Sequence, residues 1–498
     1  MADEKSVGIL VAWSRKRSGM EIGMTKQGFN PYLPSWEYIP DGEPHVFGNR
    51  VYVYGSHDRF DGYTYCLNDY VCWSAPVEDL TDWMYEGVIY KKSDDPCNPD
   101  GDMCLYAPDV TQGADGRFYL YYVLDRKHIV SVAVCDTPAG KYEFYGYVHY
   151  EDGTLLGEKE GDEYQFDPGV LTEGQDTYLY TGFCPKEMEE RHGAMVTVLG
   201  EDMLTIKRKP SFVVPSAPYC KGTGYEGHEF FEASSIRKVG ETYYFIYSSI
   251  YGHELCYATS TSPLEGFAYQ GVIVSNNDSY IDTYKPALQP MFYGGNNHGS
   301  IVEILGKWYI FYHRHTNGTN YSRQGCVEEI TFLPDGRIPQ VEMTSCGSNG
   351  GPLRGEGEYP AYIACNLYCK EPSAYTAGPG DWMDCRFPKI TQEGRDGEQC
   401  EGFIFNMRDG ATAGFKYFNC KNVSGIGAKV RGGRGGCLEV RTAWDGECIG
   451  EIPVVRTNNW HYCEAPIQIP DGVRALYFTY RGNGDIDFAA FKLIAGEQ

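Results

Sequence analysis

A glycine turn followed by a tyrosine-rich strand recurs five times in the N-terminal part of this chain. The five hairpins are FGNRVYVYGS (47–56), DGRFYLYYV (115–123), EGQDTYLYTG (173–182), VGETYYFIYS (239–248) and LGKWYIFYH (305–313). Aromatic and β-branched residues favour strands, and glycine favours the turns between them. The turn glycines lie 58 to 68 residues apart, which is a long and nearly even period.

Further strands complete each repeat. In three repeats the hairpin is followed by a strand, a polar turn and a strand that contains aromatic-x-Gly, at 72–90, 133–150 and 256–274. The third repeat, with 194–214, and the fifth, with 326–343, follow this pattern more loosely. Four-stranded sheets repeated at a fixed period are typical of a β-propeller. The sequence therefore predicts an all-β protein whose first domain is a five-bladed β-propeller.

A polar side chain stands at the same place in every repeat, seven or eight residues before the turn glycine. These side chains are Asp41, Asp109, Asp167, Glu232 and His298. The first strand of a propeller blade lines the central axis, so equivalent residues converge on one cavity. A buried carboxylate is costly unless it has a partner or a task. We therefore expect a ring of polar groups at the mouth of the axis.

The charge of the chain argues against two classes of partner. It has 43 basic and 68 acidic residues, and its net charge is −25. Such a balance disfavours nucleic acid and anionic membrane surfaces. A neutral sugar is neither attracted nor repelled by it, and solubility is the simplest reason for the acidity.

The cysteines indicate a reducing compartment. The chain has 18 of them, scattered singly through the strand segments without a CxxC pair. The apolar run at residues 7–13 is too short and too badly flanked for a secretion signal, and no run approaches transmembrane length. We expect a cytoplasmic protein with reduced thiols, with a secreted, disulfide-bonded protein as the alternative.

A change in the pattern of strands and turns after residue 343 indicates a second domain. The stretch TSCGSNGGPLRGEGEYP (344–360) is rich in glycine, and the strands after it are separated by glycine and asparagine turns. We therefore expect a propeller domain at 1–345, a linker at 346–360 and a β-sandwich of jelly-roll type at 361–498.

Four sequence stretches of the repeat resemble motifs of a known enzyme family. IPDGEPHVF, YAPDV, FFEAS and NNHGSIVE resemble the blade motifs of glycoside hydrolase family 43, whose five-bladed, inverting enzymes trim xylan and arabinan. The resemblance covers about residues 28 to 345. The end of the chain, notably GDIDFAAFKLI (484–494), resembles a family 6 carbohydrate-binding module, although Asp485 stands where such modules often have asparagine.

The resemblance implies roles for three carboxylates. Inverting hydrolysis needs a base that activates water and an acid that protonates the leaving oxygen. By their matching positions, Asp41 is the general base, Glu232 the general acid, and Asp109 the residue that orients the acid and raises its pKa. Asp167 occupies the analogous place in the third blade, and we interpret it as a structural carboxylate.

Further positions match residues that bind metal or sugar in the family. His298 corresponds to the axial histidine that faces a calcium ion in many members, and a plain hydrogen-bonded histidine is the alternative. Arg323 corresponds to the arginine that reaches the sugar hydroxyls. Trp73, His57 and Asp58 are candidates for the wall of the first sugar subsite, with a core position as the alternative for Trp73.

The resemblance implies a xylan 1,4-β-xylosidase that releases xylose from the non-reducing end of xylo-oligosaccharides or arabinoxylan fragments. An α-L-arabinofuranosidase, or an enzyme with both activities, is the alternative. A retaining sialidase or fructosidase is disfavoured because the chain lacks S-x-D-x-G-x-T-W boxes and an NDPNG start. A propeller that only binds carbohydrate is the non-enzymatic alternative. The C-terminal domain either binds sugar or packs against the propeller.

Overall fold

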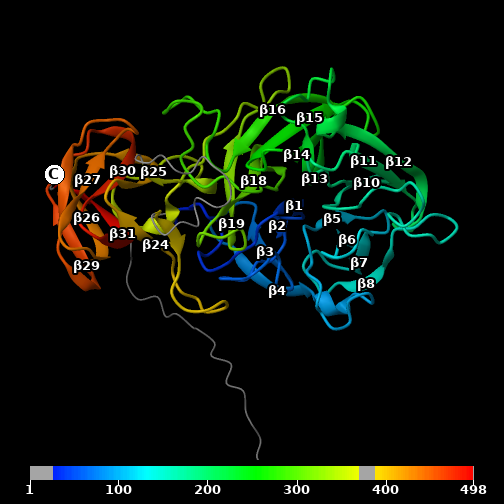
Figure 1. Ribbon diagram of the computed structural model, residues 1–498, viewed down its shortest axis with the longest axis horizontal. Coiled ribbons are helices and arrows are strands. Elements are labelled where there is room, and N and C mark those ends of the chain that lie inside the picture. The colour runs from blue at the N-terminus through cyan, green and yellow to red at the C-terminus, as the bar shows by residue number, and fades with distance from the viewer. Residues whose placement is uncertain (1–25, 370–386, 497–498) are drawn as a thin grey trace, which may run out of the picture.

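The computed structural model describes residues 26–369 and 387–496, and strands make up most of its regular structure (Figure 1). Five antiparallel sheets occupy the first part of the chain. The first sheet comprises β1 (Glu43–Phe47), β2 (Arg50–Tyr54), β3 (Tyr70–Pro76) and β4 (Met84–Tyr90). The second comprises β5 (Asp109–Gln112), β6 (Phe118–Tyr122), β7 (Ser131–Cys135) and β8 (Glu143–Tyr147). The third comprises β9 (Gly169–Glu173), β10 (Asp176–Thr181), β11 (Gly193–Leu199) and β12 (Ile206–Pro215).

The last two sheets close the set. The fourth comprises β13 (Phe230–Val239), β14 (Thr242–Ser249), β15 (Glu254–Ser260) and β16 (Ala268–Ser275). The fifth has only three strands, β17 (Ile301–Ile304), β18 (Lys307–His315) and β19 (Arg323–Ile330). Short 3₁₀ turns, η1 (Lys92–Asp94) and η2 (Ala217–Tyr219), lie in the connections. The prediction of an all-β protein with a five-bladed propeller is confirmed.

The repeated glycines form the hairpin turns, as the sequence predicts. All five have a positive φ, a conformation in which only glycine has no side-chain penalty. The values are 64° at Gly48, 85° at Gly116, 63° at Gly174, 60° at Gly240 and 79° at Gly306.

The first strands of the sheets surround the axis. Ser235 of β13 donates to the hydroxyl oxygen of Ser300 beside β17 at 2.7 Å, and Gly42 bridges to Gly299. The ring closes where the segment before β1 runs along β19: Asn30 Nδ2 donates to the carbonyl of Val327, and Asn30 Oδ1 accepts from its amide, both at 2.9 Å. The segment thus lies beside β19, the outermost of the three strands in the fifth sheet, where each of the other four sheets has a fourth strand.

Two six-stranded sheets form the C-terminal part. The first contains β20 (Leu353–Arg354), β22 (Asn366–Cys369), β25 (Ala411–Cys420), β27 (Gly436–Arg441), β28 (Gly450–Val454) and β30 (Gly472–Gly482). The second contains β21 (Gly357–Pro360), β23 (Lys389–Thr391), β24 (Phe403–Arg408), β26 (Val423–Gly432), β29 (Thr457–Ala465) and β31 (Asp485–Ala495). The rings of Phe415 and Phe491 meet between them at 4.6 Å.

The prediction that 346–360 is a linker is wrong, because part of this segment belongs to these sheets. It holds the 3₁₀ turn η3 (Gly347–Asn349) and the strands β20 and β21, which pair with β25 and β31, and a further turn, η4 (Ala361–Ile363), follows. The glycines therefore do not mark a free tether, because their neighbours already bond to the second domain.

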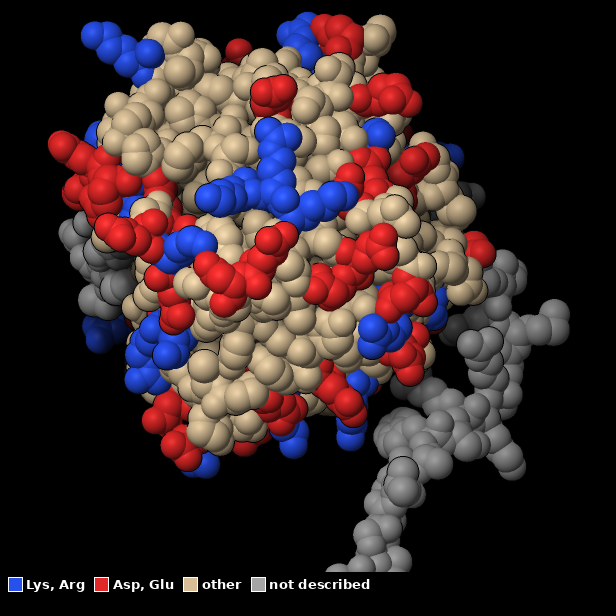
Figure 2. Space-filling view, turned by 90° about the vertical axis from the view of Figure 1, so that its right-hand side faces the viewer, with Lys and Arg blue, Asp and Glu red and all other residues tan. Residues whose placement is uncertain are grey.

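The two domains share one core. Side chains of the fourth and fifth blades, such as Ile246 and Ile310, belong to the same buried cluster as Leu367 and Phe415 of the C-terminal sheets. On the face shown in Figure 2, acidic and basic side chains are interspersed. Among the described residues, no helix is long and apolar enough to span a membrane.

Candidate active site

A cavity of about 300 Å³ lies where the inner strands of four blades begin. Four of the five repeat-equivalent polar residues reach it, and the rest of its wall is largely aromatic. Its lining comprises Asp41, Tyr65, Cys66, Tyr106, Ala107, Phe166, Asp167, Phe183, Phe231, Glu232, Asn296, His298 and Arg323. A cavity of this size is at the small end of ligand pockets.

Unusual backbone conformations bring three carboxylates to this cavity. Asp41 and Asp167 precede the inner strands of their blades with φ of 57° and 43°, which is the left-handed region that side chains other than glycine seldom adopt. Glu232 lies in β13 at an irregularity of the pairing with β14, and Ala233 after it has φ of 68°. Such strain is typical of functional sites.

Arg323 joins the carboxylate of Asp41 to the wall of the cavity. Its Nη1 donates to Asp41 Oδ1 at 3.0 Å, while its Nε and Nη2 donate to the two oxygens of Asp58 at 2.8 and 3.0 Å. The guanidinium also lies 4.9 Å from the ring centre of Tyr65. This bidentate clamp fixes one direction for the arginine, and the arginine in turn fixes Asp41.

The electrostatics of the cavity favour the protonated form of Glu232. Burial raises its pKa well above the usual range, and the negative charges of Asp167 and Asp41 raise it further. Burial likewise raises the pKa of Asp167, to about 7, although His298 opposes the shift. The amide of Ala233 donates to Asp167 Oδ2 at 3.0 Å, so Asp167 is fixed to the strand that carries Glu232.

Asp109 does not reach the cavity, and this corrects the role predicted for it. Its carboxylate accepts the amide of Val170 at 2.8 Å and contacts His45 Nε2 at 2.7 Å. Burial raises the pKa of Asp109, but the contact with His45 and the nearby Arg237 outweigh this and lower it. The carboxylate that stands beside Glu232 and raises its pKa is Asp167, which the sequence analysis interpreted as structural.

Three residues predicted to contact sugar do not line the cavity. His57 Nε2 and Trp73 Nε1 bond to the two oxygens of Glu37, at 3.0 and 3.1 Å. Trp73 belongs to the core of the first blade, the alternative considered for it. Asp58 is fully buried and accepts from Arg323. None of the three is among the residues that line the cavity, so the prediction that they form the wall of its sugar subsite is wrong.

Aromatic side chains form much of the cavity wall, and the sequence pattern did not indicate most of them. Tyr106 packs against Phe166 at 5.5 Å, Phe166 against Phe183 at 4.9 Å, and Phe183 against Phe231 at 5.5 Å. The only sequence signal was position: Phe166 directly precedes Asp167, and Phe231 precedes Glu232. Aromatic faces of this kind suit the apolar side of a sugar ring.

His298 faces both the cavity and the axis below it. Its Nδ1 lies 3.7 Å from Asp167 Oδ2, and its Nε2 lies 3.5 Å from Glu43 Oε1. Burial lowers its pKa, but the surrounding carboxylates outweigh this and raise the pKa to about 9. Neither His298 Nε2 nor Glu43 Oε1 has a hydrogen-bond partner, although both are buried. When protonated, His298 faces Glu43 as an ion pair at 3.5 Å, and a cation that displaced this proton would have both atoms as ligands and would take the remaining ones from water.

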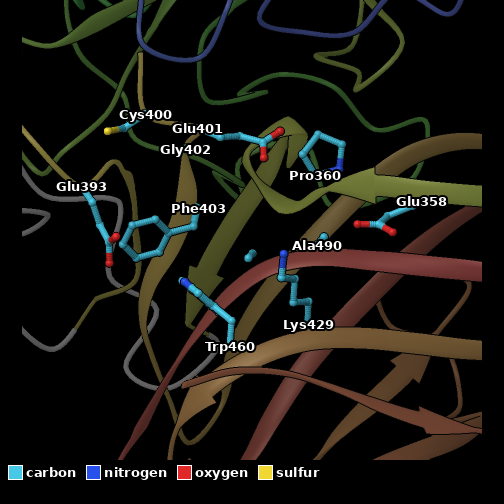
Figure 3. Close-up of a pocket in the computed structure, with 11 residues that line it drawn as sticks. Glu358, Pro360, Glu393, Cys400, Glu401, Gly402, Phe403, Lys429, Trp460 and Ala490 are labelled. Atoms are coloured by element: carbon cyan, nitrogen blue, oxygen red, sulfur yellow. The ribbon is translucent and has the colours of Figure 1, made fainter. Parts of the chain in front are cut away.

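A second cavity, of about 520 Å³, lies on the C-terminal sheet that contains β21, β26 and β31 (Figure 3). Trp460 and Phe403 line it together with Lys429 and several glutamates. The guanidinium of Arg431 lies 4.3 Å from the ring centre of Trp460, so one face of the indole is already covered.

The comparisons with known proteins agree with this geometry. Residues 39–338 match the family described as glycosyl hydrolases family 43. A xylosidase/arabinosidase of Thermoclostridium stercorarium is 68% identical over 470 residues, which cover 94% of this chain and 99% of that protein.

Two solved structures are similar as well. A family 43 β-xylosidase/α-arabinofuranosidase from a compost microbial metagenome, in a calcium-free form with xylotriose, is 26% identical, with a TM-score of 0.50 over 64% of this chain and 98% of its own. An arabinoxylan arabinofuranohydrolase from Bacillus subtilis, in complex with cellotetraose, is 20% identical with a TM-score of 0.50, over 94% of this chain and 98% of its own. At that identity the likeness concerns the fold alone.

Proposed function

Because the chain belongs to glycosyl hydrolase family 43, we propose that this glycoside hydrolase releases xylose from the non-reducing end of β-1,4-xylo-oligosaccharides with inversion. The observation that carries the proposal is the small cavity whose wall holds Asp41, Asp167 and Glu232. Xylo-oligosaccharides and arabinoxylan fragments are its proposed substrates. The names of the curated relatives, which join xylosidase and arabinosidase activity, support this substrate class.

The three carboxylates divide the chemistry. Asp41, held by Arg323 at 3.0 Å, accepts a proton from the attacking water. Glu232, whose pKa is raised by burial and by Asp167, keeps its proton and gives it to the leaving oxygen. Asp167 touches neither reacting atom in this scheme and acts through the charge that it places beside Glu232.

The size of the cavity supports removal of single terminal sugars. About 300 Å³ bounded by five aromatic rings accommodates the end of a sugar chain rather than a long open segment. The rings of Phe231, Phe183 and Phe166 would stack on the sugar and exclude water, which strengthens the electrostatic effects on Glu232.

We extend the proposal to a calcium ion near the axis. His298 Nε2 and Glu43 Oε1, both buried without a hydrogen-bond partner, would hold it together with water. Its charge would fix His298 beside Asp167. Removing calcium with a chelator should lower the rate, and adding calcium should restore it; indifference to both treatments would contradict this part of the proposal.

We also propose a cytoplasmic location, where imported oligosaccharides would be trimmed. The described cysteines are free, which supports a reducing compartment. Cell fractionation followed by immunoblotting tests this, and recovery of the protein outside the cytoplasm would contradict it.

The proposed mechanism has a direct test in the first product. NMR of the reaction with a β-xyloside should show α-xylose before mutarotation, because water attacks the face opposite the leaving group. Glu232→Gln should slow xylobiose far more than an activated aryl xyloside, by about 10²-fold or more, since only the poor leaving group needs a proton donor. Initial release of β-xylose would exclude Asp41 as a base in an inverting reaction.

An α-L-arabinofuranosidase remains the second candidate, and the combined activities in the relatives' names favour it. The kcat/KM values for aryl β-xyloside and aryl α-arabinofuranoside separate the two. We expect the xyloside to be the better substrate, and a large preference for the arabinofuranoside would reverse the assignment.

A further inference from the structure

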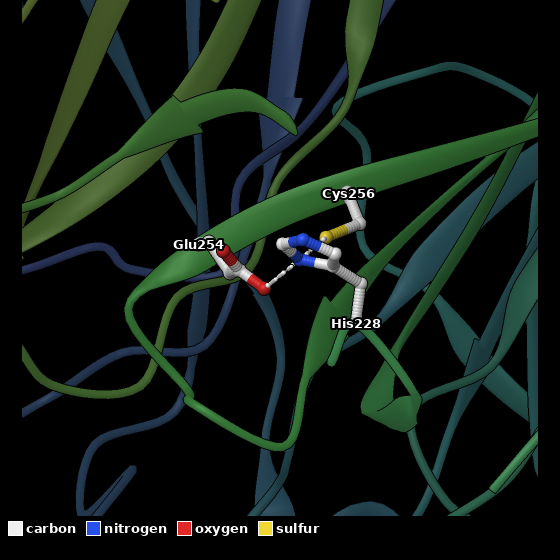
Figure 4. A group of neighbouring side chains, drawn as sticks. All are labelled: His228, Glu254 and Cys256. Atoms are coloured by element: carbon white, nitrogen blue, oxygen red, sulfur yellow. Dashed lines mark hydrogen bonds and ion pairs between the residues drawn. The ribbon is translucent and has the colours of Figure 1, made fainter. Parts of the chain in front are cut away.

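A second cluster of metal-ligating side chains lies in the fourth blade, outside the cavity described above (Figure 4). His228 precedes β13, and Glu254 and Cys256 lie at the beginning of β15. His228 Nδ1 is 2.7 Å from Glu254 Oε1, which is also 3.5 Å from Cys256 Sγ, and the sulfur is 3.8 Å from His228 Nδ1. One nitrogen, one oxygen and one sulfur thus face a common point.

Only one of the two oxygens of the Glu254 carboxylate has hydrogen-bond partners. Glu254 is fully buried, and its Oε1 receives His228, Cys256 and the hydroxyl of Ser249. Its Oε2 is also buried but has no hydrogen-bond partner. A buried carboxylate oxygen without a partner is expensive, so Glu254 offers an ion or a water a second acceptor at Oε2, in addition to the Oε1 that faces the ring and the sulfur.

The distances suit a tetrahedral metal. With zinc bonds of about 2.0 to 2.3 Å, ligand atoms in a tetrahedron stand about 3.3 to 3.6 Å apart. The sulfur–oxygen and sulfur–nitrogen distances, 3.5 and 3.8 Å, are close to this range. Only the nitrogen–oxygen distance of 2.7 Å must open, because it is a hydrogen bond in the absence of metal.

The charges also balance. A thiolate and a carboxylate carry two negative charges, which one divalent ion neutralises, so binding leaves no net charge in this buried place. Imidazole and thiolate ligands select zinc over calcium or magnesium, which prefer oxygen. The His228 side chain is 28% exposed, which gives the ion a path and leaves room for water as a fourth ligand.

We propose that His228, Glu254 and Cys256 form a zinc site. On binding, the Cys256 thiol releases its proton to solvent and the neutral His228 ring carries its proton on Nε2 instead of Nδ1, so that zinc–sulfur and zinc–nitrogen bonds form with no change of oxidation state. The ion would link the loop that ends at His228 to β15. His228 lies four residues before Glu232 on the same chain segment. The ion would stabilise the strand that carries the proposed acid.

Cobalt(II) provides the test, because it replaces zinc and shows a sulfur-to-metal absorption band. The full chain, stripped of metal, should bind one equivalent of Co²⁺ with this band, and Zn²⁺ should displace it and raise Tm. Cys256→Ser should abolish the band, and His228→Gln should weaken Co²⁺ binding at least tenfold. Excess Ca²⁺ should leave the band unchanged, which separates this site from the one at His298.

Cys326→Ser is the matched control. Cys326 is also buried in a strand, but among the described residues it does not belong to a cluster of His, Cys, Asp and Glu side chains close enough to hold a metal ion. This variant should keep the band and the Zn²⁺-dependent rise in Tm. Absence of the band in the parent protein would overturn the proposal, and so would its survival in Cys256→Ser. If Cys256→Ser fails to fold, unchanged Co²⁺ binding by His228→Gln would overturn it equally.

Discussion

At the scale of single residues, the direction in which a carboxylate points decides its role. Asp41, Asp109 and Asp167 stand at equivalent places in three blades, yet only Asp41 and Asp167 line the cavity. These two have a positive φ, whereas Asp109 begins β5 and bonds to amides of its own and the next blade. Each strained residue costs about 1–3 kcal/mol, which the surrounding structure must offset.

Asp167→Asn should move the alkaline limb of the kcat/KM profile to lower pH. The proposed acid must be protonated to act, and the loss of a neighbouring negative charge lowers the pKa of Glu232. Activity at the original optimum should fall by about tenfold or more. Asp109→Asn is the control, since Asp109 is absent from the charges that raise this pKa. A limb that moves in Asp109→Asn and not in Asp167→Asn would restore the original prediction.

At the scale of elements, the close approach of β9 and β13 holds Asp167 and Glu232 together. A Cβ on Gly169, at the beginning of β9, would lie 2.4 Å from the carbonyl oxygen of Ser234 in β13. Only glycine therefore permits this spacing. The contact explains why a glycine follows the proline after Asp167 in FDPGV.

Gly169→Ala should push the two strands apart. We expect a loss of about 1–3 kcal/mol in the free energy of unfolding, as for other overpacked sites, together with a loss of kcat. Gly174→Ala on the same hairpin is the control: its Cβ meets nothing within 4 Å, so it adds only the cost of a φ of 63°. Denaturant unfolding and kcat/KM check both. Equal kinetic effects in the two variants would contradict a role for the strand spacing.

At the scale of the whole molecule, the C-terminal domain forms hydrogen bonds to a propeller loop that lines the cavity. Asp396 Oδ1 accepts the amide of Phe60 at 2.7 Å, and Asp396 Oδ2 accepts Asn68 Nδ2 at 3.1 Å. These two residues bracket most of the loop that supplies Tyr65 and Cys66 to the cavity. The second domain is thereby coupled to the site, whether or not it binds sugar.

Asp396→Ala should loosen that loop. The two donors lose their acceptor at a cost of about 1–3 kcal/mol, and kcat/KM should fall several-fold. Asp409→Ala is matched to it: Asp409 accepts the amide of Gly482 at 3.0 Å within the same domain. Steady-state kinetics and thermal unfolding compare the two. A similar kinetic loss in Asp409→Ala would show that general destabilisation, not the loop, is responsible.

Deletion of residues 353–498 should give insoluble protein. The cut exposes the core shared by the two domains. It also removes Lys416, whose Nζ lies 3.1 Å from the fully buried carboxylate of Asp278. An unpaired buried charge of this kind costs about 3–5 kcal/mol. Solubility after expression checks this, and a soluble fragment with normal Tm would contradict it.

The sequence by itself determined the strands, the turns and the number of blades. These follow from local physics: a glycine with positive φ, an aromatic strand after it, and a period that repeats both. Asp41, Glu232, Arg323 and His298, which the repeat and the family resemblance indicated, lie in the wall of the cavity, and their chemical roles stay predictions.

Only the tertiary structure decided which equivalent residue faces the cavity. The direction of Asp109 depends on Val170 and His45, and that of Asp58 on Arg323, far along the chain. The β20 and β21 strands likewise exist because β25 and β31 offer them partners. Spacing along a chain sets where a side chain is attached, but the partners that fold against it set where it points.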